Sequence, residues 1–202
     1  MPGSTPVGCR DGGGRLPSAD AIAIRAATRA DVLAIGRIPV ESWRETYRGV
    51  LPERLLHSLS ALVRAAMWQG ALEHEPPVLL FVAQGPSGEL VGFAGGGPCR
   101  ATSLPHDAEV YAIYLLRAAQ QRGCGRRLMA ALTAALHARG FRSICLWVLR
   151  ENTNARRFYE RLGGEVVGER TAVDGEDAFD EIAYGWDRLE SLCSALELQD
   201  RH

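Results

Sequence analysis

In the middle of the chain, the spacing of apolar residues changes from strand-like to helical and back to strand-like. Residues 110–116 form a strand-like run, and apolar positions over residues 128–139 recur every three or four residues, which predicts a helix that ends at Gly140. Residues 144–149 are a continuous apolar run of strand length, which is typical of a strand covered on both faces. The centre of the chain is therefore predicted to be a strand, a helix and a second strand.

Shorter apolar runs continue this pattern on both sides. Two of them flank a Gly-Pro-Ser-Gly turn at residues 85–88 and so predict a hairpin. The strand candidates outside the centre are residues 22–25, 78–83, 90–94, 165–169 and 181–186.

The helix candidates have recognisable ends. Thr28 and Asp31 have the spacing of a capping box, with Asp in place of Glu, and predict a helix start. Pro39 falls inside the pattern that follows, where we expect a kink or a break. Further helical patterns cover residues 55–68, 155–162 and 189–198. Asn154 is the expected N-cap of the second of these helices.

Length and charge limit the classes of protein. The chain has 202 residues and a formal net charge of −1, which suits one domain with its own core and indicates neither nucleic acid nor an anionic membrane as a partner. No apolar run approaches the length that spans a bilayer. Residues 1–20 are rich in Gly and Pro and lack the apolar segment of a secretory signal, so we expect a disordered tail. The globular domain is expected over residues 21–188, followed by a helical tail over residues 189–202.

Cysteine usage indicates the compartment. Five cysteines, an odd number without paired spacing, argue against a disulfide framework and favour a reducing cytoplasm. Cys145 lies in an apolar run and is expected in the core. The sequence contains no CxxC or HxxxH pattern, so we expect no metal.

The segment from Gln120 to Arg127 carries the most informative chemistry. Two glycines and three arginines, with no acid, stand where a strand turns into a helix. A helix start presents backbone N–H groups and a partial positive charge, and glycine lets a ligand approach the backbone, so the segment predicts a phosphate-binding loop. It lacks the Lys-Ser/Thr of a Walker A loop and the third glycine of the dinucleotide fingerprint.

Two plainer interpretations compete with that prediction. The segment could be an ordinary strand-to-helix turn with solvated arginines. It could also be a basic nucleic-acid patch, but no aromatic residue is interleaved with the arginines and the chain is not basic.

Two motifs in succession resemble one family. The form Gln120-x-x-Gly123-x-Gly125 is similar to the pyrophosphate-binding motif of the GNAT N-acetyltransferase superfamily. The later string, which looks like the second half of the GNAT signature, is Asn152-x-x-Ala155-x-x-Phe158-Tyr159-Glu160-x-Leu162-Gly163. The motifs come in the family's order with a helix and a strand between them, and the resemblance covers residues 21–188.

The resemblance implies a fold and a co-substrate. The implied fold is α/β (α+β), with a mixed, mostly antiparallel central sheet of about six to seven strands, splayed between its two central parallel strands and flanked by about four helices. The implied co-substrate is acetyl-CoA, bound mostly by backbone groups. The residues placed on it are Ile113, Tyr114, Leu115, Gln120, Gln121, Arg122, Gly123, Cys124, Gly125, Arg126, Asn152 and Tyr159.

The resemblance also implies two catalytic residues. Tyr159 is placed beside the CoA sulfur, and Glu109 stands where the family often has an acid that acts as base, directly or through water. Each has a plainer interpretation, because Tyr159 also belongs to an apolar helix stripe and Glu109 also suits a strand edge; Asn152 likewise suits a turn. The weaker base candidates are Glu41, Asp180 and His106, the last of which we expect to be a solvated loop residue.

The predicted activity is transfer of an acetyl group from acetyl-CoA to a primary amine of a small molecule or of a protein or peptide, by direct attack in a ternary complex. The alternatives are a non-catalytic acetyl-CoA-binding sensor or partner subunit, and an acyltransferase that uses another acyl-CoA. Because the family is often dimeric through its last strands, a homodimer is expected. Acidic residues near a predicted loop at residues 171–179 suit either a cationic acceptor or a solvated turn, and they are Asp174, Glu176, Asp177, Asp180 and Glu181.

Overall fold

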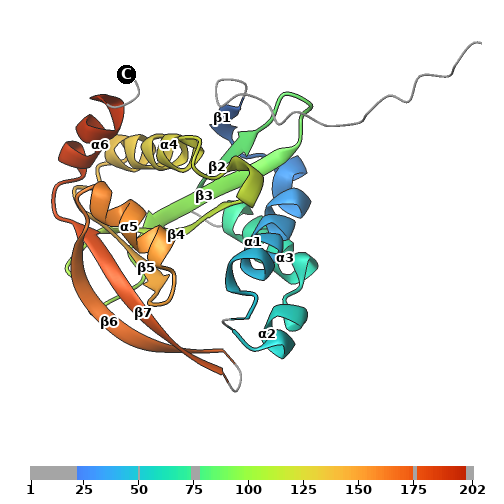
Figure 1. Cartoon of the computed structure of the whole chain (residues 1–202). Coiled ribbons are helices and arrows are strands. Elements are labelled where there is room, and N and C mark those ends of the chain that lie inside the picture. Colours follow the sequence, from blue (N-terminus) through green and yellow to red (C-terminus); the bar gives the residue numbers. More distant parts are fainter. Residues whose placement is uncertain (1–21, 50, 74–77, 175–176, 199–202) are drawn as a thin grey trace, which may run out of the picture.

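A seven-stranded mixed sheet forms the centre of the computed structural model, which describes residues 22–49, 51–73, 78–174 and 177–198 (Figure 1). The strand order is β1-β2-β3-β4-β5-β7-β6, and every neighbouring pair is antiparallel except β4 and β5. The expected mixed and mostly antiparallel sheet is confirmed. The strands are β1 (Ala23–Ala26), β2 (Leu79–Gln84), β3 (Leu90–Pro98), β4 (Ala108–Leu115), β5 (Ile144–Leu149), β6 (Glu165–Asp174) and β7 (Asp177–Trp186).

Six α-helices occur in the described residues, where about four were expected. They are α1 (Val32–Tyr47), α2 (Glu53–Ser58), α3 (Ala61–Glu73), α4 (Cys124–Ala138), α5 (Thr153–Arg161) and α6 (Leu189–Leu198). The helix predicted over residues 55–68 is wrong as a single element, because the backbone of Leu59 is extended and Ser58 bonds back to the carbonyl of Leu55. Thr28 and Asp31 do form a capping box, although the turn that they begin is a short 3-10 helix.

The helices cover both faces of the sheet. Helices α4, α5 and α6 share one apolar core with the strands, in which Leu128, Leu146 and Leu192 are buried. Helices α1 and α3 cover the opposite face, where Ile35 and Phe93 belong to a second buried cluster. The helix α6 packs on α4, so this C-terminal helix is part of the core (Figure 1).

A β-bulge in β4 decides which side chains face each layer. Gly95 pairs with Ala112 and the next residue, Gly96, pairs with Val110, so Tyr111 is an extra residue in β4. A bulge bends its strand and changes the alternation of side chains. After the bulge, Ile113 and Leu115 join the core beneath α4, whereas Ala112 and Tyr114 face α1 and α3.

The parallel pair at the centre of the sheet separates along its length. Only Ala108, Glu109 and Val110 of β4 pair with β5, opposite residues 144–146. Both strands continue beyond that point, to Leu115 and Leu149, without pairing to one another. The splay expected between the central strands is therefore present.

Helix α1 packs unusually close to α3. A Cβ atom on Gly36 would lie 2.3 Å from the carbonyl oxygen of Ala61 and 2.8 Å from the Cβ of Ala65. The absent side chain lets the two backbones meet. The expected break at Pro39 does not occur, because α1 continues to Tyr47. The fully buried Ile35 and Ile38 lie before the proline and the buried Val40 follows it, so the helix is held against the domain on both sides of Pro39.

The loop predicted over residues 171–179 is also wrong, because β6 and β7 extend through it. Thr171 pairs with Asp180, and Val173 pairs with Ala178. The alternating pattern was too weak in this hairpin to predict strands of this length. The predicted tail at residues 1–20 and the acidic residue Glu176 lie outside the described residues.

We expect Gly36→Ala to lower the free energy of unfolding by about 1–3 kcal/mol, because the added methyl group overpacks the contact between α1 and α3. Gly70→Ala is the matched control, since Gly70 lies in α3 with open space around its Cβ position. The control is expected to be neutral or to stabilise by about 0.5–1 kcal/mol through helix propensity. Thermal or denaturant unfolding measures both, and equal effects would contradict the packing argument.

Candidate active site

A cleft opens where β4 and β5 separate. Its volume is about 750 Å³, and its walls come from the unpaired parts of both strands, the loop before α4, helix α5 and the last turns of α1. The candidate residues Ile113, Tyr114 and Leu115 line it from β4. Because these residues have no strand partner on the β5 side, their backbone can pair with a ligand that lies in the cleft.

The loop before α4 forms one end of this cleft. The helix begins at Cys124, four residues earlier than its apolar spacing predicted, so the N–H groups of its first turn belong to the loop segment. Gly123 is the N-cap at a φ of 75°, and Gln121 has a φ of 58°, which is uncommon for a residue with a side chain. Gln120 donates to the carbonyl of Leu115 at 3.0 Å and so ties the loop to the end of β4.

The side chains of this loop divide into two groups. Gln120, Gln121, Gly123, Gly125 and Arg126 line the cleft. Two further predicted cofactor residues, Arg122 and Cys124, are not among the lining residues, and the thiol of Cys124 is turned into the core.

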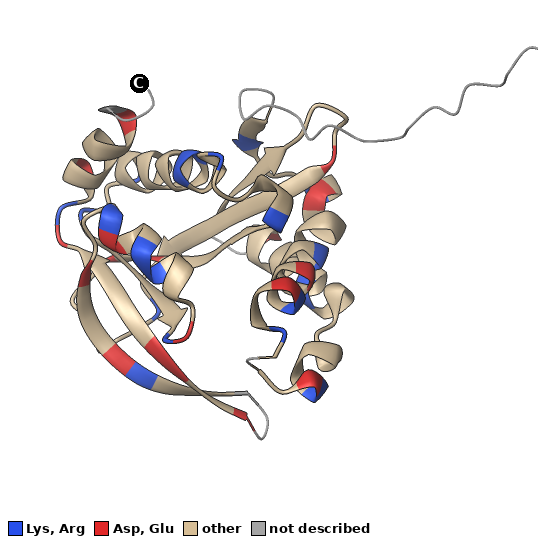
Figure 2. Cartoon of the chain, in the orientation of Figure 1, with Lys and Arg blue, Asp and Glu red and all other residues tan. Residues whose placement is uncertain are grey.

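The arginines of the first helical turn have structural contacts. Arg126 donates to the carbonyl of Leu196 in α6 at 3.5 Å. Arg127 donates to the carbonyl of Ile22, next to β1, at 2.8 Å. These contacts fasten the start of α4 to both ends of the described chain, so the loop is a supported part of the domain. Figure 2 shows basic positions at the start of α4 and along α5.

Asn152 connects α5 to α1. Its Oδ1 accepts a hydrogen bond from the backbone N–H of Ala155 at 3.1 Å, and its Nδ2 donates to the hydroxyl of Tyr47 at 2.8 Å. Asn152 is therefore the N-cap of α5, and the expectation that Asn154 fills that position was wrong. Both asparagines line the cleft. Burial raises the pKa of Tyr47 well above its ordinary range, so its hydroxyl remains protonated.

Tyr159 lines the cleft from α5 and is 5% exposed. Its ring packs against the rings of Phe158 and Tyr184, and its hydroxyl makes no hydrogen bond to any residue that the structure describes. Burial raises the pKa of Tyr159 well above its ordinary range. The phenol is therefore protonated near neutral pH and has a proton to donate into the cleft.

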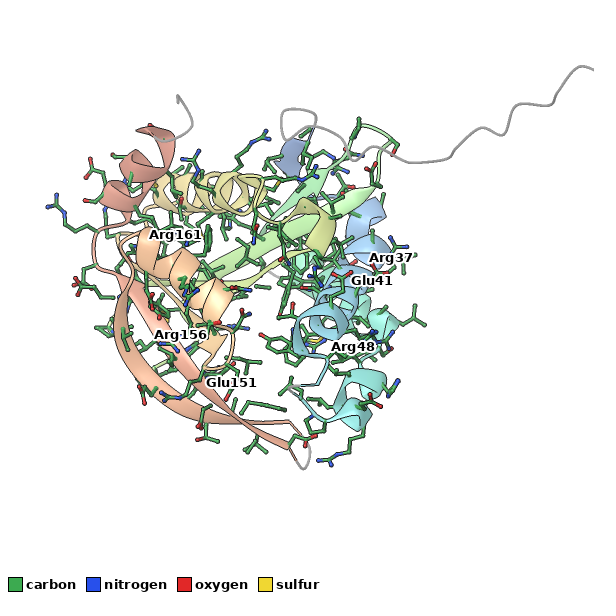
Figure 3. All side chains as sticks on the ribbon, in the orientation of Figure 1. Arg37, Glu41, Arg48, Glu151, Arg156 and Arg161 are labelled. Atoms are coloured by element: carbon green, nitrogen blue, oxygen red, sulfur yellow. The ribbon has the colours of Figure 1, made fainter. Side chains whose placement is uncertain are left out.

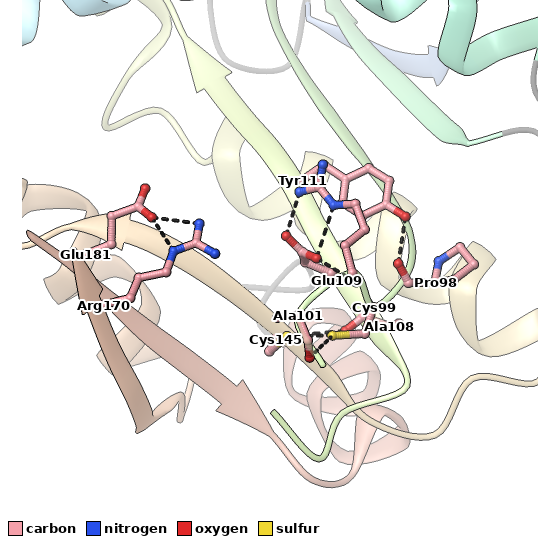
Figure 4. A network of polar contacts seen from close by, with 10 residues as sticks. Pro98, Cys99, Ala101, Ala108, Glu109, Tyr111, Cys145, Arg170 and Glu181 are labelled. Carbon is pink, nitrogen blue, oxygen red and sulfur yellow. Dashed lines mark hydrogen bonds and ion pairs between the residues drawn. The ribbon is translucent and has the colours of Figure 1, made fainter. Parts of the chain in front are cut away.

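Glu109 lies at the end of β4 that pairs with β5 (Figure 4). It is 4% exposed, and both of its carboxylate oxygens accept hydrogen bonds from Arg100, at 2.6 Å to Oε1 and 3.2 Å to Oε2. The backbone N–H of Arg100 also donates to Oε2, at 3.0 Å. Glu109 is not among the residues that line the cleft.

Glu181 is an acid to which the sequence analysis gave no catalytic role, because it stood at the start of a predicted strand and in an acidic cluster near a predicted loop. It projects from β7 and is the one carboxylate among the described residues that line the cleft. Arg170 donates to its Oε2 at 2.7 Å, and no described residue donates to its Oε1 (Figure 4). Motif spacing could not have found it, because its position depends on the extension of β7 beside the end of β5.

The weaker base candidates lie away from the cleft lining. Glu41 pairs with Arg37 at 3.1 Å on the outer side of α1, where Figure 3 labels both. Asp180 accepts a hydrogen bond from Thr171 at 3.0 Å. The expectation that His106 is solvated was wrong, because its side chain is buried beside Gly185 of β7.

Arginines offset much of the acidic character of the β6–β7 hairpin. Besides the pair between Arg170 and Glu181, Asp177 pairs with Arg54 of α2. Figure 2 shows acidic and basic positions next to one another on these strands. Two members of the acidic cluster, Asp177 and Glu181, are therefore engaged by arginines.

The described residues limit two other kinds of site. Nowhere in them do three His, Cys, Asp or Glu side chains gather in a way that could hold a metal ion. Across the same residues, none of the helices combines the length and the apolar character needed to cross a membrane.

Comparisons with known proteins agree with this geometry. The model of the acetyltransferase (GNAT) family matches residues 40–164. The uncharacterised N-acetyltransferase YuaI of Bacillus subtilis is 33% identical over 175 residues, which cover 87% of this chain and 98% of that protein. A solved structure of a GNAT-family acetyltransferase from Desulfovibrio desulfuricans is 25% identical, with a TM-score of 0.62, and the match covers 83% of this chain and 99% of the other.

A further solved structure, YncA of Salmonella typhimurium with acetyl-CoA, has a TM-score of 0.63 at 20% identity, over 83% of this chain and 94% of that one. The family match and the relative in Bacillus subtilis cover most of the chain, and the cleft has the shape that the motifs implied. The chain therefore belongs to the GNAT family of acetyl-CoA-dependent acetyltransferases.

We expect Asn152→Ala to lower the free energy of unfolding by about 1 kcal/mol, because it removes the cap of α5 and the hydrogen bond to Tyr47. Asn154→Ala is the matched control, two residues along the same helix start, and should leave stability within about 0.5 kcal/mol. Denaturant midpoints compare the two variants. A larger loss in the control would restore Asn154 as the cap.

Proposed function

We propose that this enzyme transfers the acetyl group of acetyl-CoA to a primary amine, by direct attack in a ternary complex. The single observation that carries the proposal is the separation of β4 from β5 beyond Val110, at the end of the sheet where the N-terminus of α4 and the hydroxyl of Tyr159 also lie. This juxtaposition supplies a backbone edge, an anion site and a proton donor in one cleft.

The walls of the cleft suit the parts of the co-substrate. The pantetheine arm would pair with the free backbone edge at Ile113 to Leu115, and the pyrophosphate would lie on the N–H groups of the loop from Gln121 to Arg126. The positive φ at Gln121 and Gly123 supports this assignment, because it turns successive N–H groups toward one concave side. Asn152 holds the start of α5 in place, so its contribution is to position the helix that carries Tyr159.

The chemistry needs a neutral amine and a proton for the leaving group. An alkyl ammonium has a pKa near ~10, so an amine at neutral pH must lose a proton before it attacks the thioester. The attack places negative charge on the thioester oxygen, which backbone N–H groups of β4 can stabilise. Tyr159 then donates its proton to the departing thiolate, a role that its buried and protonated phenol supports.

Two carboxylates are candidates for the proton acceptor. Glu109 is the residue that the sequence motif favours, and it would need a water molecule or movement of Arg100 because both of its oxygens accept hydrogen bonds from that arginine. The geometry favours Glu181, which lines the cleft and has Oε1 without a described donor. We therefore propose that Glu181, which lines the cleft, is the general base, and that Glu109 holds Arg100 in position.

Tyr159→Phe tests the proposed function. The variant keeps the buried ring but has no proton to donate, so kcat is expected to fall by about 10²-fold. Acetyl-CoA should still raise the unfolding temperature as it does in the parent, since a ligand at a hundred times its Kd adds about 2.7 kcal/mol to the folded state. Thiol release and thermal unfolding provide the two readouts. If the variant keeps full turnover, Tyr159 has only a packing role. If the parent protein binds acetyl-CoA but acetylates no amine, the protein is a sensor.

Glu181→Gln tests the base. Loss of the carboxylate should lower kcat/KM by about 10²-fold at neutral pH and remove the acidic limb of the pH–rate profile, because Gln cannot accept the proton. Arg170→Gln is the control, since it breaks the same ion pair but keeps the carboxylate. Glu109→Gln should change the KM of the acceptor and leave that limb in place. If only Glu109→Gln removes the acidic limb of the pH–rate profile, Glu109 is the base and Glu181 is not.

A further inference from the structure

A second cavity lies on the opposite side of β4 from the α4 core. Its volume is about 660 Å³, and it is lined by α1, α3, the end of β3 with the residues that follow it, and the part of β4 from Tyr111 to Tyr114. Four residues line both this cavity and the cleft, namely Trp43, Tyr111, Ala112 and Tyr114. The two spaces therefore meet along the splayed part of β4, where an amine in one could reach a thioester in the other.

Most of the wall of this cavity is apolar. Trp43 and Trp68 stand on α1 and α3, and Gly95 of β3 leaves room for the ring of Trp68, whose nearest atom would lie 2.9 Å from a Cβ at that position. Trp68 packs edge-on against Phe93, and Trp43 donates to the hydroxyl of Tyr114 at 3.2 Å. The rings are thus fixed by their neighbours and form a preformed apolar pocket.

The charged residues among the described lining are both arginines, Arg64 and Arg100. The side chain of Arg64 is partly buried and forms neither a hydrogen bond nor an ion pair with any residue that the structure describes. Arg64 lines the same cavity as Tyr114, and Tyr114 is one of the residues that this cavity shares with the cleft. A partly desolvated cation on an apolar wall is stabilised when a ligand supplies the anion.

Arg100 is held at the other side of the cavity. Its Nε and Nη2 donate to Glu109, and its guanidinium carbon lies 3.8 Å from the centre of the Tyr111 ring. Its Nη1 donates to no described residue and has N–H groups left for a ligand. The buried Glu109 thus holds a second donor in the lining of the same cavity.

We propose that this cavity is the acceptor site and that it takes an α-amino acid with a large apolar side chain; the proposal rests on the acetyl transfer proposed above. The carboxylate would pair with Arg64, in the wall of the cavity that also includes Tyr114. An amine on the same carbon atom would then lie at the splayed edge of β4, and the apolar side chain would fill the space between the tryptophans. An amine without a carboxylate would leave the Arg64 cation unpaired.

The test compares each amino acid with its own amide. Phenylalanine and leucine differ from phenylalaninamide and leucinamide chiefly in the carboxylate, and thiol release from acetyl-CoA gives kcat/KM for each. The acids are expected to be preferred by about 10-fold to 100-fold, the range of a charge-assisted hydrogen bond. The amides have the more readily deprotonated amines, so the chemistry alone would favour them, and a preference for the acids must come from binding.

Arg64→Gln should reduce that preference to near parity, and Arg64→Lys should keep part of it. Arg37→Gln is the matched control, an exposed arginine on α1 that lines neither cavity, and it should keep the full preference. Thermal unfolding with acetyl-CoA shows that each variant is folded and binds its co-substrate.

The outcomes separate the two proposals. If acetyl-CoA does not stabilise the parent protein, the proposed function fails. If it does, but the parent acetylates the amides as well as the acids or acetylates neither, the acceptor assignment is overturned and the acetyl-CoA site stands. An equal loss on acids and amides in Arg64→Gln also overturns it, because Arg64 would then support only the structure of α3.

Discussion

The parting of two parallel strands is the constraint on which the rest of this enzyme depends. A strand at the centre of a sheet normally has both edges occupied, but β4 pairs with β5 over three residues and then continues with only its β3 edge paired. The bulge at Tyr111 lies where that pairing ends, and a bulge bends the strand that carries it. The result is a free backbone edge deep inside the domain, which is the feature that a peptide-like arm of a co-substrate can occupy.

The same bulge gives the sheet two usable faces. Beyond it, Ile113 and Leu115 enter the core beneath α4, and Ala112 and Tyr114 turn toward α1 and α3. The cleft beside the loop before α4 therefore lies next to an apolar cavity on the other face, and the two share Trp43 of α1 and three residues of the splayed part of β4. A reaction between two substrates that approach from opposite faces needs this arrangement, because each must reach the same short segment of backbone.

Two Arg–Glu pairs near this edge differ in whether the carboxylate keeps an oxygen that accepts no hydrogen bond from its arginine. In the pair of Arg100 with Glu109, both carboxylate oxygens are taken, whereas Arg170 contacts only Oε2 of Glu181. A carboxylate with a free oxygen can accept a proton without losing its ion pair. A carboxylate that is fully engaged instead fixes its arginine, so the first pair is suited to orient a cation and the second to take part in chemistry.

The sequence by itself determined the features that depend on local spacing. Residues 144–149 were predicted as a strand with the bounds that the structure has. The segment from Gln120 to Arg127 was predicted as the turn between a strand and a helix, and the turn is present although the helix already begins at Cys124. Such features are predictable because apolar periodicity and glycine act over a few residues. Tertiary structure decided the rest. Asn152 caps α5 while also bonding to Tyr47, which lies 105 residues away, and β7 carries Glu181 into the cleft by pairing with β5. The burial of His106 and the exposure of Arg64 to a cavity likewise arise where segments distant in the chain pack together, and no local pattern records such contacts.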